Sequence, residues 1–243
     1  MTLKTRRQFE TLARAAERTG LSTRTLRRRI AAGDLVAYRS GPRIIRLDPD
    51  DVELIDGVRV TSAARTIIDL SRSVSFESAV VCADFGLRTG LVTPDQLRAA
   101  VDRAHRTLGA GQARRVVAFA DGRSESVGES RSRVAMHVAG LPAPDLQIEV
   151  RSRHGLIVGR CDFGWEEQRT LGEFDGAVKY GALLRPGQAP GDAVFAEKRR
   201  EDRIRDEGWR VVRWTWAELD GVGTAMERIR RALGAQADRR TVS

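Results

Sequence analysis

Only two cysteines and three histidines occur among the 243 residues, and their positions exclude two kinds of site. Cys82 and Cys161 lie far apart and outside any CxxC pair, so neither a disulfide framework nor a zinc site is predicted. The histidines, at positions 105, 137 and 154, are too scattered to build a His-Asn-His catalytic site. A Walker phosphate-binding loop is absent as well.

Long hydrophobic runs are also missing. No stretch approaches the roughly 18 uninterrupted apolar residues of a membrane span. The first twenty residues contain no apolar block of the kind that marks a secretory signal. We therefore expect a cytoplasmic protein with no membrane partner. Hydrophobic residues still make up 41% of the chain, which is enough for a genuine core.

Positive charge is concentrated at the N-terminus. Residues 1–46 contain twelve basic and three acidic residues, a net charge of +9, and the rest of the chain contains thirty of each. A concentrated positive field favours a polyanion, and nucleic acid is the usual one. The alternative, an anionic membrane surface, requires bulky apolar residues on a basic amphipathic helix, and Trp and Phe are nearly absent from this segment.

The basic segment has the cap and turn residues typical of two short helices followed by a hairpin. Apolar spacing predicts a helix over about 7–19, and a second helix lies between Ser22, as its cap, and Gly33. Two β-rich runs flank the Ser-Gly-Pro turn at 40–42 and predict a hairpin. With Leu26 and Ile30 facing inward, the arginines that we expect to face a ligand are Arg24, Arg27, Arg28, Arg39 and Arg43.

Residues 6–53 resemble the winged helix-turn-helix domains of excisionase and MerR-type proteins. The resemblance implies that the second helix enters the major groove of double-stranded DNA, where arginine pairs with guanine edges or with phosphates. The sequence leaves open which of the two applies. The alternative is an ordinary solvated basic helix face. We assign residues 1–53 to this DNA-binding domain.

Residues 57–120 form a predicted helical connector with no catalytic pattern. Four segments show helical apolar spacing between Ser, Thr or Gly signals, and Thr93 with Pro94 marks one helix start. The small polar stretch at 120–130 predicts a boundary. We assign the last domain to residues 125–243, where helix and strand patterns alternate and predict an α+β fold with a mixed sheet flanked by helices.

Carboxylates gather within two predicted strands of this last domain. Glu173 and Asp175 share one face of a strand because side chains alternate. A hairpin through residues 164–168 brings Asp162 within reach of Glu173. Acids this close repel unless a cation lies between them, so the pattern indicates a metal site or a misread register. Oxygen ligands without histidine favour Mg²⁺ or Mn²⁺, and such a site suits phosphodiester hydrolysis.

The pattern resembles the PD-(D/E)XK nuclease superfamily, more narrowly its very-short-patch-repair-like endonuclease branch. The resemblance implies an acid on the first helix, matched by Glu129, an acid in the second core strand, matched by Asp162, and a third-strand pair, matched by Glu173 and Asp175. It also implies that Glu129, Asp162 and Glu173 hold the metal. The departure is Asp175, which stands where the superfamily usually has lysine.

The missing cationic group is matched by one of two lysines. The only lysines in the chain are Lys4, Lys179 and Lys198, and the last two lie close to the acidic segment in sequence. Lysine places a compact charge on a developing oxyanion, although chance placement is the alternative. Trp209, Trp214 and Trp216 lie in a strand that also resembles the end of the endonuclease domain, and we expect core packing rather than base stacking from them.

Two functions therefore remain open from the sequence. In the first, a basic N-terminal domain delivers a metal-dependent endonuclease domain to duplex DNA. In the second, the architecture resembles antitoxin regulators of abortive-infection systems, in which the protein represses transcription, has lost nuclease activity and has a protein partner such as a cognate toxin. The substitution at Asp175 favours the second function, whereas the ordered set of acids favours the first.

Overall fold

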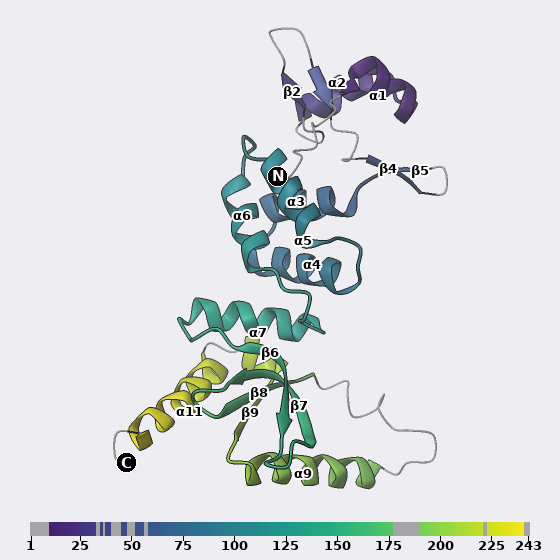
Figure 1. Ribbon diagram of the computed structural model, residues 1–243. Coiled ribbons are helices and arrows are strands. Elements are labelled where there is room, and N and C mark those ends of the chain that lie inside the picture. The colour runs from purple at the N-terminus through teal and green to yellow at the C-terminus, as the bar shows by residue number, and fades with distance from the viewer. Residues whose placement is uncertain are drawn as a thin grey trace, which may run out of the picture. The chain divides into compact units, whose positions relative to one another are not determined.

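The structure is a computed structural model that describes residues 10–32, 35, 37–39, 45–47, 52–55, 58–176, 190–220 and 223–240. Its elements are labelled in Figure 1. Helices and a four-stranded mixed sheet occur in the same chain, so the predicted α+β class is confirmed. The chain divides into two compact units, Met1–Ala79 with Thr89–Phe119, and Val80–Arg88 with Ala120–Ser243. In the described part, no helix has both the length and the hydrophobicity needed to cross a bilayer.

The first unit begins with two helices and a small antiparallel sheet. These elements are β1 (Glu10–Thr11), α1 (Leu12–Thr19), α2 (Thr23–Ala32), β2 (Tyr38–Arg39) and β3 (Ile45–Leu47), with the strand order β1-β3-β2. The first helix starts at residue 12 rather than 7 because the Thr11 hydroxyl caps it by accepting the Arg14 N–H at 3.1 Å. It ends at Gly20, whose φ of 53° is left-handed. Leu26 of α2 is 2% exposed and packs into a small core.

A second strand pair was missed in the sequence. Strands β4 (Val52–Ile55) and β5 (Val58–Thr61) pair antiparallel, with Ile55 opposite Val58. The prediction instead closed the first domain at residue 53 and began the helical segment at 57. The Asp-Gly dipeptide at 56–57 is a strong hairpin signal between two β-rich runs, so the pattern was present in the sequence.

Four helices follow, and the cap predicted at Thr93 is present in one of them. They are α3 (Ala63–Ser73), α4 (Phe76–Arg88), α5 (Pro94–Arg103) and α6 (Ala110–Phe119). A full capping box starts α5, since the Thr93 hydroxyl accepts the Gln96 N–H at 3.2 Å and the Gln96 side chain accepts the Thr93 N–H at 2.8 Å. Gln112 ties α6 to the end of α3 by donating to the Ser71 and Val74 carbonyls.

The second unit is built on a four-stranded sheet with the order β6-β7-β8-β9. Its elements are α7 (Val127–Val138), β6 (Asp145–Arg151), β7 (Ile157–Trp165), β8 (Thr170–Asp175), α9 (Pro190–Asp206), β9 (Arg210–Thr215), α10 (Trp216–Asp220) and α11 (Thr224–Arg240). The first two strand pairs are antiparallel, whereas β8 and β9 run parallel. A parallel pair needs a crossover, and α9 lies between the two strands in the chain.

Helices cover both faces of this sheet, and a separate core lies under each face. Figure 1 shows α7 and α9 on opposite sides of the strands. The core on the α7 and α11 side contains Phe163 stacked on Trp214, whose indole N–H donates to Ser132 of α7 at 2.8 Å. The core on the α9 side is smaller and includes Cys161 and Ile204. Both cores fix the strand register from which the acidic side chains project.

Candidate functional site

An arginine face covers the exposed side of α2. Arg24, Arg27 and Arg28 are all exposed, and the spacing of three and four residues places them on one side of the helix, away from buried Leu26. None of the three has an ion-pair partner among the described residues. Arg39 lies in β2, and Arg43 lies outside the described residues. The α2 face therefore presents three guanidinium groups to solvent, with no acidic partner in the part of the chain that the structure describes.

Glu129, predicted as the first-helix acid, lies at the start of α7 and is 5% exposed. Its carboxylate accepts hydrogen bonds from the Ser126 hydroxyl at 2.7 Å, the Glu125 N–H at 2.8 Å and the Gln147 side-chain amide at 2.9 Å. Ser126 in turn caps α7 by accepting the Glu129 N–H at 3.2 Å. Glu129 thus completes a capping arrangement and fastens α7 to β6.

Asp162 lies where the sheet is irregular. Its carboxylate accepts the backbone N–H of Phe174 in β8 at 2.8 Å, so a side chain takes the place of a strand carbonyl. The partner strand is distorted at the same level, because Gln147 has a φ of 57° and is skipped in the pairing between β6 and β7. A residue other than glycine in this left-handed region costs about 1–2 kcal/mol. Gln147 is held there while its side chain reaches Glu129.

Glu173, the predicted third-strand acid, is held by arginines on the α9 side. One carboxylate oxygen accepts Arg200 at 2.6 Å and the Cys161 thiol at 3.3 Å, and the other accepts Arg213 at 2.8 Å. Both arginines also bind Glu197, and Arg213 contacts Glu201 at 3.3 Å. These residues form an ion-pair network that ties β8 and β9 to α9.

Titration in the network follows from these contacts. The hydrogen bond from Arg200 holds the pKa of Glu197 below its ordinary value of 4.5. Burial, and next the negative charge of Glu173, raise the pKa of the Cys161 thiol well above its ordinary value. Cys161 therefore stays protonated and donates to Glu173, as a buried unreactive thiol. The network therefore favours the charged form of Glu197, which Arg200 and Arg213 both bind.

The described carboxylates are held by other side chains and are not grouped around a common cation. No group of three or more His, Cys, Asp or Glu side chains is placed to share a cation in the described part of the chain. Glu129 accepts three hydroxyl and amide donors, and Glu173 accepts two guanidinium donors and a thiol, so a metal at either carboxylate would compete with hydrogen bonds that the structure already makes. The assignment of Mg²⁺ or Mn²⁺ to Glu129, Asp162 and Glu173 stays a prediction from the sequence.

The remaining predicted residues are spread along the same unit. Asp175 ends β8 and pairs in register with Thr215 of β9. Lys198 is exposed on α9. Lys179 lies outside the described residues. Trp214 is fully buried and Trp209 is 9% exposed, in agreement with the core packing expected for them.

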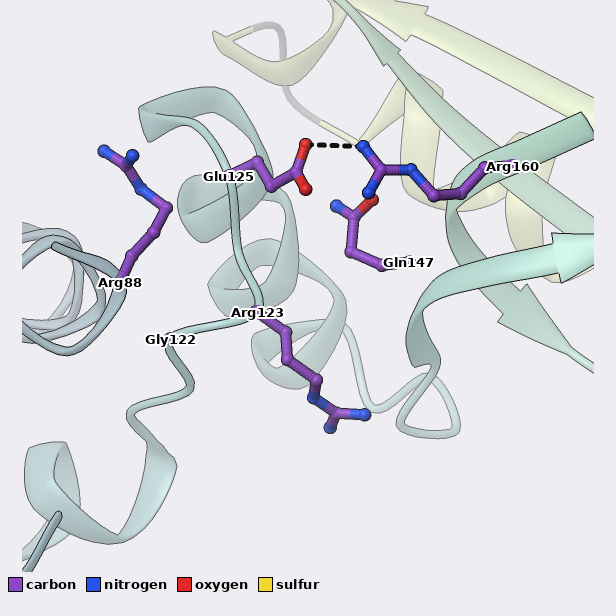
Figure 2. Close-up of a pocket in the computed structure, with 6 residues that line it drawn as sticks. All are labelled: Arg88, Gly122, Arg123, Glu125, Gln147 and Arg160. Carbon is purple, nitrogen blue, oxygen red and sulfur yellow. Dashed lines mark hydrogen bonds and ion pairs between the residues drawn. The ribbon is translucent and has the colours of Figure 1, made fainter. Parts of the chain in front are cut away.

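Sequence reasoning missed an open pocket of about 510 Å³ inside the second unit. It is lined by Arg88, Gly122, Arg123, Glu125, Gln147 and Arg160. In Figure 2 the arginines come from separate elements, and Arg160 of β7 is paired to Glu125, whereas the Arg88 and Arg123 side chains point in other directions. No local sequence pattern predicts this pocket, because its lining residues come from the end of α4, the loop before α7 and two strands.

A buried charge cluster beside α7 was missed as well. Asp84 of α4 is 1% exposed and accepts hydrogen bonds from Arg133 at 2.6 Å, Ser130 at 2.8 Å and the Asp121 N–H at 2.7 Å. Burial raises the pKa of Asp84 above its ordinary value of 3.8 despite the opposing charge of Arg133. The cluster joins the 80–88 part of α4 to α7 within the second unit.

Comparison with known proteins gives two kinds of match. Two uncharacterized proteins of Mycobacterium tuberculosis, from strains CDC 1551 and H37Rv, are each 29% identical over 187 residues, which is 77% of this chain. The chain spans 63% of the length of these relatives. An excisionase of Mycobacterium phage D29 is 46% identical over 48 residues, 20% of this chain and 86% of the phage protein. No family model matches, and no solved structure does.

Proposed function

We propose that this chain binds double-stranded DNA through its N-terminal fifth, the part of the chain that belongs to the family of the phage excisionase. The observation that carries the proposal is the α2 face, on which Arg24, Arg27 and Arg28 are exposed without ion-pair partners among the described residues. Arginines on an exposed helix face bind backbone phosphates and guanine edges in the major groove. In the winged helix-turn-helix interpretation, α2 is the recognition helix and β2 with β3 forms the wing.

The proposal predicts how DNA affinity depends on salt. Each arginine-phosphate contact releases condensed counterions and contributes about 0.9 to the slope of log affinity against log salt. The variant with Arg24, Arg27 and Arg28 all changed to Ala should therefore lose up to about 2.7 in slope, since up to three contacts disappear. Fluorescence anisotropy with a labelled DNA duplex, over a range of NaCl concentrations, measures the slope.

A matched control removes the same charge elsewhere in the first unit. Arg98, Arg114 and Arg115 are exposed on α5 and α6, and changing all three to Ala should leave the slope near that of the wild type. If the α2 variant keeps the wild-type slope, or if both variants lose it equally, the DNA interface is not on α2.

Metal-dependent hydrolysis of DNA by the second unit is a finer proposal that rests on the sequence resemblance. One geometric feature favours it, namely that the Asp162 carboxylate reaches β8 beside Glu173. The arginines bound to Glu173 favour DNA binding without hydrolysis, as in the regulator interpretation. Plasmid nicking in Mg²⁺ or Mn²⁺ by the wild type, with none by Asp162→Asn, is the result that would establish hydrolysis. Equal DNA binding without nicking by either protein supports the regulator interpretation.

A further inference from the structure

The pocket that Arg88, Arg123 and Arg160 line in the second unit has the properties of an anion site. The lining carries three guanidinium groups against the single carboxylate of Glu125. Arg88 makes no ion pair among the described residues and lies 5.3 Å over the ring of Phe85. Since guanidinium groups around an open pocket attract a planar or tetrahedral oxyanion, the excess of arginine over carboxylate favours phosphate chemistry.

Two features of the backbone shape the walls of the pocket. Gly122 is pressed against the last turn of α4, and a Cβ there would lie 2.9 Å from the Leu87 Cβ and 3.1 Å from the Arg88 nitrogen. On the other wall, Gln147 keeps its left-handed backbone while its amide donates to Glu129. Such strain persists only where the surrounding structure fixes it, and it is concentrated at functional positions. The loop before α7 and the kink in β6 thereby bring arginines of distant elements around one space.

The three arginines are not equally available to a ligand. Arg123 is held by Asp121 through two nitrogens, at 2.7 Å and about 3.1 Å, and so belongs to the loop structure. Arg160 pairs with Glu125 at 2.8 Å, but both side chains are about half exposed, so the pair is weak and exchangeable. Arg88 and Arg160 are therefore the residues that meet an incoming anion, and Glu125 competes with it for Arg160.

We propose that this pocket is a second DNA contact, in which Arg88 and Arg160 bind phosphates of the duplex backbone and Glu125 weakens the contact by occupying Arg160. The inference rests on the proposed DNA-binding function and extends it to the second unit. The bound group is a phosphodiester, which has the charge and acceptor oxygens that two guanidinium groups bind. A contact of this kind adds affinity without reading sequence.

Removing the arginines and removing the competing carboxylate should change the slope of log DNA affinity against log salt in opposite directions. In the full-length protein, the double variant Arg88→Ala, Arg160→Ala should lose about 1.8 in slope, because two phosphate contacts disappear. Glu125→Gln should bind DNA more tightly with a slope about 0.9 steeper, because Arg160 is released to a phosphate. A gain of binding cannot come from damage to the fold, so this variant separates a ligand site from a structural role.

Matched controls lie on the neighbouring strand β6 and, for Arg88, at exposed Arg114 of α6. Arg151 and Glu149 of β6 form a pair with side-chain exposures of 56% and 47%, against 52% and 48% for Arg160 and Glu125. The double variant Arg114→Ala, Arg151→Ala and the single variant Glu149→Gln remove the same charges outside the pocket. Both should keep the wild-type slope.

The outcomes distinguish failure of the second DNA contact from failure of DNA binding by α2. If the wild type fails to bind DNA, the proposed function itself is wrong. If the α2 variant loses slope while the pocket variants match their controls, only the second contact is overturned. A last arm adds inorganic phosphate at constant ionic strength. If phosphate raises the melting temperature of the wild type but not of the double variant, and the DNA slope is unchanged, the pocket holds a small free anion and the DNA contact is overturned.

Discussion

Replacing Glu173 by Gln tests whether this acid is part of the fold or is kept for a metal. The substitution preserves the shape of the side chain but removes its charge and puts two N–H donors where an oxygen was. One of these donors then faces Arg200 or Arg213, each of which donates to the carboxylate at 2.6 and 2.8 Å in the wild type. The Cys161 thiol is a third donor at 3.3 Å. At least one arginine thus loses its hydrogen bond to this side chain, and both lose the attraction of its charge.

The size of the loss follows from the burial of the network. Hydrogen bonds to charged groups contribute about 1.5–3 kcal/mol to stability, and we expect a destabilisation in this range. Breaking a fully buried ion pair costs about 3–5 kcal/mol, but Arg200 and Arg213 are 23% and 30% exposed and keep Glu197 as a partner. The smaller range therefore applies.

Tryptophan fluorescence during urea unfolding is a selective assay for this effect. All four tryptophans lie between residues 165 and 216, so the signal reports the second unit alone. We expect Glu173→Gln to lower the free energy of unfolding equally in EDTA and in Mg²⁺. The matched control is Glu149→Gln, which breaks an exposed Glu-Arg pair of the same sheet and should cost at most about 1 kcal/mol.

The opposite result would refute the structural role. If Glu173 served to bind a metal, its negative charge would lower the stability of the metal-free protein. Glu173→Gln would then unfold at higher urea than the wild type in EDTA, and Mg²⁺ would stabilise the wild type but not the variant. Such an outcome would also revive the metal site predicted from the sequence.

Three further predictions concern stability. Gly128→Ala should destabilise the protein by at least about 1–3 kcal/mol, since the new Cβ would lie 2.0 Å from the ring of buried Phe174. Gly111→Ala is the control, because it is also at the second position of its helix but has no atom within 4 Å, and it should stabilise by up to about 1 kcal/mol. Urea unfolding followed by circular dichroism measures both changes. Thr93→Ala should cost about 1 kcal/mol by removing the cap of α5, and Thr93→Ser should restore most of it in the same assay. Burial raises the folded-state pKa of Asp84 above 3.8, so the folded protein binds the carboxyl proton more tightly than the unfolded chain does. The free energy of unfolding of the wild type, relative to Asp84→Asn, should therefore fall as the pH rises from 3.8. A difference that grows across pH 4 to 7 would contradict the raised pKa.

The helices of the chain were predictable because their ends carry local signals. Thr93 with Pro94 and Ser126 with Glu129 mark helix starts through contacts made within one turn, which a sequence reveals directly. The β4-β5 hairpin also had a local signal, which was overlooked. The parallel pairing of β8 with β9 had none, because it depends on where α9 carries the chain.

The partners of the acids were not predictable for a related reason. Glu129 and Glu173 were assigned to the correct helix and strand, but Glu173 pairs with arginines 27 and 40 residues further along the chain. The chain has 42 basic residues, and no periodicity selects Arg200 and Arg213 from them. The cations that the structure places at Glu173 are guanidinium groups, and the divalent metal stays a prediction from the sequence.

The kink at Gln147 and Asp162 shows why alternation alone fails at this site. In a regular strand Cys161 and Phe163 would face one core, yet Cys161 packs on the α9 side and Phe163 on the α7 side. Leu146 and Val150 of the neighbouring strand are divided in the same way, so both strands change face at the same level. The Asp162 carboxylate makes this change possible by satisfying the backbone donor that the displaced strand leaves behind. The same displacement carries the Gln147 side chain to Glu129, so the wall of the arginine pocket is a consequence of how Asp162 bonds to β8.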